Sequence, residues 1–278
     1  MRSIFRKISG KKLPIGEPDA ARWGNPPNDP TNPTWTAKNW LTARYHFEFA
    51  RYKNPLNQRF GVLKVMNDDL LQPSRGFETH PHKDMEIATY VVSGHLSHKD
   101  SMGSWETLQA GSVQYMSAGT GVTHSETNMH ESLPCRMIQM WVPPRTLDLE
   151  PNYGSASSPA EGRRNRFFHL VGDCEDVGCN APLIRIYQDV NMYVADISPG
   201  EIAAFELKTD RQAYTLCMEG NVIEVSRDGA STPIETLMMY DGAEAHGGCS
   251  LQFRPVGEAE GKVLLVEMAE DGSGRGDL

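Results

Sequence analysis

The stretch "GFETHPHKDMEIATYVVSG", residues 76–94, joins two histidines to a run of apolar and β-branched residues. His80 and His82 are two residues apart, and such side chains point to the same face only on an extended strand. The run that follows them has the composition of a strand and ends at Gly94. Pro81, between the histidines, fits the start or the edge of a strand. We therefore expect both imidazoles to project from one strand face.

A second pair of candidate ligands follows in "SAGTGVTHSETN", residues 117–128. His124 and Glu126 are again two residues apart, after a turn that contains Gly119 and Gly121. Either pair alone is weak evidence, because such spacings also occur where no metal is bound. Two extended segments that each carry two ligands on one face, however, can converge inside a small β-barrel. Three imidazoles and one carboxylate suit a divalent transition metal, which could keep open positions for substrate or dioxygen.

Other residues compete for a place in such a site. Glu86 could face the same way as the histidines, but an unbroken strand would put it roughly 13 Å from His82 at about 3.3 Å per residue. A bend in the chain would bring it closer, so Glu86 is an alternative ligand to Glu126. His46, in an alternating segment, fits either a buried core histidine or a hydrogen-bonding partner of a ligand. The remaining histidines are expected to be solvated or to lack a companion at ligand spacing: His95, His98, His130, His169 and His246.

The rest of the chain consists of short runs rich in β-branched, aromatic and Met residues. Examples are "FGVLKVMNDDLL" at 60–71 and "CRMIQMWVP" at 135–143. Clusters of Gly, Pro, Asn and Asp separate these runs, which is typical of an all-β protein built as a sandwich or barrel. The second half also echoes the first, since "ETL" recurs at 106–108 and at 235–237. We therefore predict an internal duplication and two tandem β-barrels.

Composition divides the chain into four parts. Residues 14–34 carry six prolines and little apolar periodicity, which predicts an extended arm that could pack on the second barrel. In the second half, Glu206 and Lys208 precede Gly220 by the same numbers of residues as the two histidines precede Gly94. A lysine there would repel a cation, so the second barrel is expected to be metal-free. The predicted parts are an arm at 1–40, a metal-binding barrel at 41–145, a connector at 146–180 and a degenerate second barrel at 181–278.

The overall composition limits the classes of partner. A net charge of −9 at pH 7 argues against nucleic acid as a primary partner, because nucleic acid favours a basic face. Five cysteines, an odd number without a CxxC pair, suit a reducing compartment rather than a disulfide framework. No apolar run of 18 residues is present, so no membrane partner is expected. The basic start "MRSIFRKISGKK" lacks the apolar stretch of a secretory signal, and we expect a cytoplasmic monomer, with a nuclear or organellar location as alternatives.

Four stretches resemble the pirin family, whose members are bicupins of the cupin superfamily with one metal site. They are "FGVLKVMNDD", "GFETHPHKDMEIATYVVSG", "HKDSMG" and "MSAGTGVTHSETN", and they span most of residues 40–145. The sequences "HPHKDMEI" and "SAGTGV" are similar to those of the bacterial quercetin 2,3-dioxygenase-type members. The chain departs from that branch by its Pro-rich arm and by its longer connector. The resemblance implies two tandem cupin barrels of the jelly-roll type.

The resemblance also implies a site and an activity. Pirins commonly bind iron through three His and one Glu of the N-terminal cupin, and these match His80, His82, His124 and Glu126. Fe(II) is then the expected cofactor, with Ni, Mn, Cu, Zn or Co as alternatives, and Glu86 is expected to support the ligands only. The implied activity is cleavage of a quercetin-like flavonol, or a related enediol or phenolic substrate, by dioxygen, with Glu126 as the catalytic proton acceptor. The alternative, found in animal members, is a non-enzymatic iron-dependent redox sensor that binds a protein partner and regulates transcription.

Overall fold

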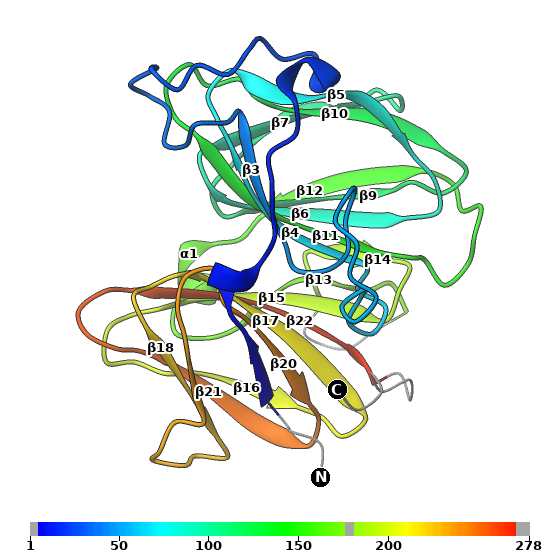
Figure 1. Ribbon diagram of the computed structural model, residues 1–278. Helices are drawn as coiled ribbons and strands as arrows, with labels where there is room; N and C mark the ends of the chain where they lie inside the picture. Colours follow the sequence, from blue (N-terminus) through cyan, green and yellow to red (C-terminus); the bar gives the residue numbers. More distant parts are fainter. Residues whose placement is uncertain (1–4, 176–180, 271–278) are drawn as a thin grey trace.

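A computed structural model describes residues 5–175 and 181–270, and there the chain is built almost entirely of β-strands, which confirms the all-β prediction (Figure 1). Short helical turns interrupt the strands at η1 (Gly10–Lys12), η2 (Ala20–Trp23) and α1 (Ala160–Arg163). None of the described helices is long and apolar enough to cross a membrane. Parts of the predicted arm, connector and second barrel lie outside the described residues: 1–4, 176–180 with Cys179, and 271–278.

The first barrel consists of two antiparallel sheets that face each other. The larger sheet runs in the order β12 (Asn152–Ser157), β9 (Ser112–Ser117), β6 (Glu86–Ser93), β11 (Cys135–Val142), β4 (Val65–Leu71), β3 (Leu41–Tyr45) and β2 (Ile15–Gly16). The smaller sheet runs in the order β5 (Arg75–His82), β10 (Val122–Asn128), β7 (His95–Asp100) and β8 (Trp105–Gln109). In the described residues β5 is an edge strand, because β10 is its one neighbour in the sheet.

The second barrel repeats this topology. Its larger sheet runs in the order β1 (Phe5–Ile8), β20 (Gly242–His246), β17 (Arg211–Glu219), β22 (Gly261–Ala269), β15 (Val190–Ile197), β13 (Phe168–Asp173) and β14 (Ile184–Ile186). Its smaller sheet runs in the order β16 (Ala203–Leu207), β21 (Cys249–Pro255), β18 (Ile223–Arg227) and β19 (Glu235–Leu237). Strands β4 to β11 thus recur in the same spatial order as β15 to β22, which is the duplication predicted from the sequence.

The two barrels pack against each other through their larger sheets (Figure 1). The largest apolar cluster combines buried residues of both sheets, for example Met66 and Met140 of the first barrel with Val194 and Leu264 of the second. Burial of this shared apolar surface is the main force that joins the barrels. A separate apolar cluster, which includes Phe253, fills the interior of the second barrel.

The predicted arm runs along both barrels and does not pack on the second barrel alone (Figure 1). β1 pairs with β20 of the second barrel, where Phe5 lies opposite Ala245. β2 pairs with β3 of the first barrel, where Ile15 lies opposite Arg44. Prolines favour an extended chain between and after these strands. The arm therefore connects the two barrels as well as extending a sheet of each.

The predicted connector also contributes strands to both barrels. β12 extends the larger sheet of the first barrel beside β9, and β13 extends that of the second barrel beside β15. β12 has the sequence "NYGSAS", whose Asn, Gly and Ala have low β-propensity. Such a segment forms a strand here because it lies at the edge of an existing sheet, which supplies its hydrogen-bonding partner. Local sequence pattern alone therefore predicted a connector at this position.

His46 lies in the interface between the two barrels. It is fully buried, and its Nδ1 is 2.8 Å from the hydroxyl of Tyr214 in the second barrel. Its other ring nitrogen, Nε2, is buried without a hydrogen-bond partner. Burial lowers the pKa of His46 to about 4; Arg44 adds to this effect, whereas Asp68 and Asp241 oppose it. His46 is therefore neutral in the folded protein at neutral pH.

Acidification should destabilise the protein through His46. The unfolded chain takes up this proton near pH 6.5 and the folded chain near pH 4, so stability is lost as the pH falls through this window. Between pH 7 and pH 5 we expect the wild type to lose about 2 kcal/mol more than His46→Gln, whose amide does not titrate. Urea unfolding of both proteins at the two pH values measures the difference. Equal losses in the two proteins would contradict this role of His46.

Candidate metal centre

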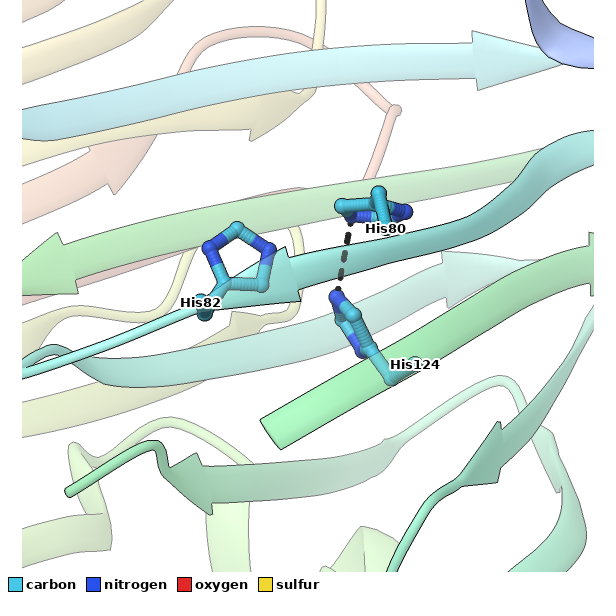
Figure 2. A group of neighbouring side chains, drawn as sticks. All are labelled: His80, His82 and His124. Carbon is cyan, nitrogen blue, oxygen red and sulfur yellow. Dashed lines mark hydrogen bonds between the residues drawn. The ribbon is translucent and has the colours of Figure 1, made fainter. Parts of the chain in front are cut away.

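Three histidines converge on the smaller sheet of the first barrel (Figure 2). His80 and His82 lie on β5, and His124 lies on β10 directly opposite His80 in the antiparallel register. Nε2 of His80 and Nε2 of His124 are 3.1 Å apart. The ring centroid of His82 is 4.9 Å from each of the other two ring centroids. The two histidines of β5 thus project from one strand face, as their spacing predicted.

A glycine turn brings β10 into this register. Gly119 and Gly121 have φ angles of +43° and +142°, which non-glycine residues rarely adopt. A Cβ atom at Gly119 would lie 1.9 Å from the carbonyl oxygen of Leu149, so a side chain does not fit there. The carbonyl of Gly119 accepts a hydrogen bond from the N–H of Asp84 at 2.9 Å, which ties this turn to the chain that leaves β5. The glycines of the second motif therefore help to hold the two ligand-bearing strands together.

The ring nitrogens of the three histidines are arranged as metal donors. Nδ1 of His80 donates a hydrogen bond to the carbonyl of Glu78 at 2.7 Å, which leaves the lone pair of Nε2 available. Nε2 of His82 and Nδ1 of His124 are buried without a hydrogen-bond partner. Two donors that each bind a shared metal at about 2.1 Å are about 3.0–3.4 Å apart, which matches the distance between His80 and His124. Without a metal, Nε2 of His124 can donate a hydrogen bond to Nε2 of His80 across this distance, and a metal would take the place of that proton. The donor set therefore fits a transition metal.

The electrostatics of the cluster keep two of its imidazoles neutral. Burial lowers the pKa of His82 to about 4, and the neighbouring His124 and His80 lower it further, against the opposing effect of Glu126. Burial likewise lowers the pKa of His124 to about 3, with further contributions from His80 and His98. A metal binds the neutral form of histidine. Both side chains are therefore in the ligand form well below neutral pH.

Glu126 belongs to a second group of potential ligands, which it forms with His98 and His124. His124 is thus common to both groups. The carboxylate of Glu126 is buried and accepts hydrogen bonds from Nε2 of Gln114 at 2.8 Å and from Nε2 of Gln139 at 2.9 Å. A β-bulge separates Glu126 from His124 in the pairing with β5. The structure therefore brings three of the four predicted ligands into one group and places the fourth in the adjoining group.

The prediction that His98 is a solvated histidine is wrong. The residue is 1% exposed, its Nε2 is 3.0 Å from Oδ2 of Asp100, and its ring stacks on Tyr153 at a centroid distance of 4.2 Å. A signal was present in "HLSHKD", where Leu96, His98 and Asp100 alternate along β7 and so share one strand face. The fully buried Leu96 marks that face as the inner one.

Sequence reasoning also missed the polar side chains that surround Glu126. Gln114 and Gln139, which hold its carboxylate, occupy β9 and β11 among mostly apolar residues. The hydroxyl of Tyr153 donates to Oε1 of Glu106 at 2.5 Å and also contacts Oε1 of Gln114 at 3.1 Å. A glutamine inside an apolar strand run is the one signal that could have identified them, because a buried amide needs partners. The interior of this barrel is therefore polar around Glu126.

Glu86 was predicted to support the ligands by hydrogen bonding, and His46 to be either a buried core histidine or such a partner; in the structure His46 is a buried core histidine, and Glu86 bonds elsewhere. Oε1 of Glu86 accepts a hydrogen bond from the hydroxyl of Ser117 at 2.5 Å, and Oε2 accepts one from the N–H of Tyr187 at 3.2 Å. His46 bonds to Tyr214 of the second barrel. Among the described residues, neither side chain belongs to a group of potential ligands. Both contribute instead to contacts between the first barrel and the second half of the chain.

Aromatic and apolar side chains flank the histidines. The ring of His82 meets Trp141 edge to face, with the centroids 4.8 Å apart. Trp141, Met85 and Tyr153 are partly buried and pack on one small apolar cluster, which is formed by Ile87, Met116 and Val122. A planar aromatic molecule is the kind of ligand that such side chains can hold through edge and face contacts. Aromatic side chains thus lie beside the candidate metal ligands.

Comparison with known proteins agrees with this description. The family model described as Pirin matches residues 29–142. A protein of Caulobacter vibrioides named as pirin-like is 37% identical over 211 residues, which are 74% of this chain and 89% of that protein. The quercetin 2,3-dioxygenase of Escherichia coli K12 is 35% identical over 184 residues, which are 66% of this chain and 76% of that protein.

The arrangement of two barrels is also found in solved structures. The crystal structure of the bacterial pirin YhhW from Escherichia coli, in complex with nickel(II), matches with a TM-score of 0.74 at 25% identity. The match covers 96% of this chain and 100% of that protein. The fold is therefore that of a bicupin, and a protein that shares it binds a divalent transition metal.

Proposed function

Because the chain belongs to the pirin family, we propose that it is a metal-dependent dioxygenase that cleaves a quercetin-like flavonol or a related enediol or phenolic substrate. The observation that carries the proposal is the cluster of three converging imidazoles, two of which have an unpartnered buried nitrogen, beside a buried carboxylate. The proposed metal ligands are His80, His82, His124 and Glu126.

The donor set supports a first-row divalent metal. Imidazole suits iron, nickel, copper and zinc, and the carboxylate widens the choice to manganese. Fe(II) is the metal we propose, with nickel next because a protein of the same fold was solved with it. When bound, such a metal would act as a Lewis acid and lower the pKa of a substrate hydroxyl.

The residues of the site would then bind, orient and deprotonate the substrate. Glu126 is the proposed proton acceptor, because each of its oxygens accepts one amide hydrogen bond and keeps a further lone pair. Gln114 and Gln139 hold the carboxylate in position through those bonds. Trp141 and Tyr153 would contact the aromatic ring of the substrate and exclude water from its face. The proton therefore passes from the substrate hydroxyl to a carboxylate oxygen of Glu126.

Anaerobic reconstitution tests the proposal. The purified chain is loaded separately with Fe(II), Ni(II), Mn(II), Cu(II), Zn(II) and Co(II), and oxygen uptake on quercetin is then measured. We expect turnover above the buffer blank with at least one metal, and no turnover with the metal-free protein. If no metal gives turnover, the proposal is wrong for this substrate class. The protein would then be tested as a redox sensor, by capture of protein partners with its ferrous and ferric forms.

A further inference from the structure

The N-terminal arm reaches the candidate metal centre through Trp23. This residue ends η2 and contacts two aromatic side chains of β5 edge to face. Its ring centroid is 5.1 Å from that of Phe77 and 5.3 Å from that of His80, both at an interplanar angle of 89°. Phe77 in turn contacts the fully buried Trp40 at 5.4 Å. A continuous row of ring contacts thus leads from the core of the first barrel to a candidate ligand.

Asn25, two residues further on, binds the backbone of the same strand. Its Nδ2 donates to the carbonyl of Gly76 at 2.7 Å, and its Oδ1 accepts from the N–H of Gly76 at 2.9 Å. One side-chain amide therefore satisfies both backbone groups of a residue at the edge of the sheet. An edge strand has such groups unpaired along one side, and β5 is an edge strand. Asn25 thus takes the place of a neighbouring strand at this point.

The segment that carries these two residues is itself held in a defined shape. Oδ1 of Asp19 accepts hydrogen bonds from the N–H groups of Ala21 at 2.9 Å and Arg22 at 3.3 Å, which caps η2. Gly24 follows with φ +65°, a conformation that suits glycine and turns the chain back towards β5. The indole N–H of Trp40 donates to the carbonyl of Pro18 at 2.7 Å and fixes the start of the segment to the barrel.

We propose that residues 19–25, the arm clamp, fix β5 at its open edge and that Trp23 is a positioning residue for His80. The inference rests on the proposed function only in taking His80 as a metal ligand. His80 needs such support because its ring is half-exposed and Nδ1 of the ring is held by the carbonyl of Glu78, which belongs to the same edge strand. Partners that orient a ligand commonly change metal affinity 10- to 100-fold when they are lost. The affinity of the site for metal therefore depends on the docking of the arm.

Metal affinity of the substrate-free protein tests the clamp. Zn(II) and Ni(II) are titrated in competition with a chromophoric chelator, so no turnover is involved. We expect Trp23→Ala to weaken binding about 10-fold, and Trp23→Phe to restore most of the loss because it keeps an aromatic ring against His80. Trp105→Ala is the matched control, since it removes a tryptophan that is 73% exposed on β8. Its affinity should equal that of the wild type.

Hydrogen exchange of the metal-free protein gives an independent readout. Asn25→Ala should speed exchange of the amides of β5, because it removes both hydrogen bonds to Gly76. Asn28→Ala is the matched control: it also removes two hydrogen bonds of the arm, with Asn39 and Trp40, but none to β5. If Trp23→Ala does not fold, the affinities of Asn25→Ala and Asn28→Ala decide the question in the same way.

The outcomes separate the clamp from the proposed function. Wild-type affinity in Trp23→Ala and Asn25→Ala, with unchanged exchange of β5, would overturn the clamp and leave the proposed function standing. Wild-type protein that binds neither metal would overturn the ligand set itself, and with it the role of Trp23 towards His80. Weakened binding in both variants with wild-type affinity in both controls supports the clamp, whatever substrate the protein acts on.

Discussion

Substitution of His124 by alanine is expected to abolish stoichiometric metal binding and all metal-dependent oxygen uptake. His124 is the one residue that belongs to both groups of potential ligands among the described residues. Its Nε2 lies 3.1 Å from Nε2 of His80, and its ring lies 5.3 Å from that of His98 between centroids. The substitution therefore removes one potential ligand from each group. We expect the affinity to fall by more than about 100-fold, beyond what the loss of a supporting residue costs.

Elemental analysis after dialysis against metal-free buffer measures this effect. His169→Ala is a suitable control, because His169 lies on β13 of the second barrel and bonds to Asn191 there. This variant should retain the metal content of the wild type. Full occupancy in His124→Ala, with a folded protein by circular dichroism, would show that the metal site lies elsewhere.

Glu126→Ala is expected to lose most of the metal, whereas Glu86→Ala is expected to retain it. Glu126 shares a group of potential ligands with His124. Glu86 belongs to no such group among the described residues; its carboxyl group accepts hydrogen bonds from Ser117 and Tyr187, and burial raises its pKa. Metal stoichiometry of the two variants decides between the two carboxylates. Full occupancy in Glu126→Ala together with loss in Glu86→Ala would reverse the assignment.

The stability of Glu126→Ala needs a separate measurement. The substitution leaves the amide groups of Gln114 and Gln139 without their shared acceptor, and each unsatisfied buried donor costs about 1–3 kcal/mol. Thermal unfolding of the metal-free protein gives the size of this effect. Metal content is then compared at a temperature where the variant is fully folded, so that loss of a ligand is not confused with loss of the fold.

The shared strand face of the candidate ligands His80 and His82 could be predicted because it depends only on local sequence. The two-residue spacing of His80 and His82 requires only that the chain be extended, and the apolar run behind it supplied that information. The duplication was visible for a similar reason, since both halves carry the same sequence of short strands. The resemblance to the pirin family then favoured Glu126 over Glu86 as the fourth ligand, a choice that parity along the strand had left open.

Local pattern left His46 open between two interpretations and could not place Glu86. An alternating strand shows which side chains share a face, but it does not show whether that face meets the barrel interior or a second barrel. His46 contacts Tyr214 and Glu86 contacts Tyr187, and both partners lie in the second half of the chain, far away in sequence. The polar neighbours of His98, Ser97 and Lys99, are typical of an exposed strand. The alternation with Leu96 and Asp100 was the better evidence.

The pairing of β1 with β20 has a consequence for the order in which the molecule folds. Phe5 lies opposite Ala245, so β1 must wait for a partner strand that is synthesised long after it. The first barrel has all its strands once β12 has been made, whereas the larger sheet of the second barrel cannot be completed until β20 and β22 appear. Contacts so distant in sequence form slowly, because a long loop must close first. The edge of β20 therefore remains open late in folding, and its pairing with β1 joins two strands that are far apart in the chain.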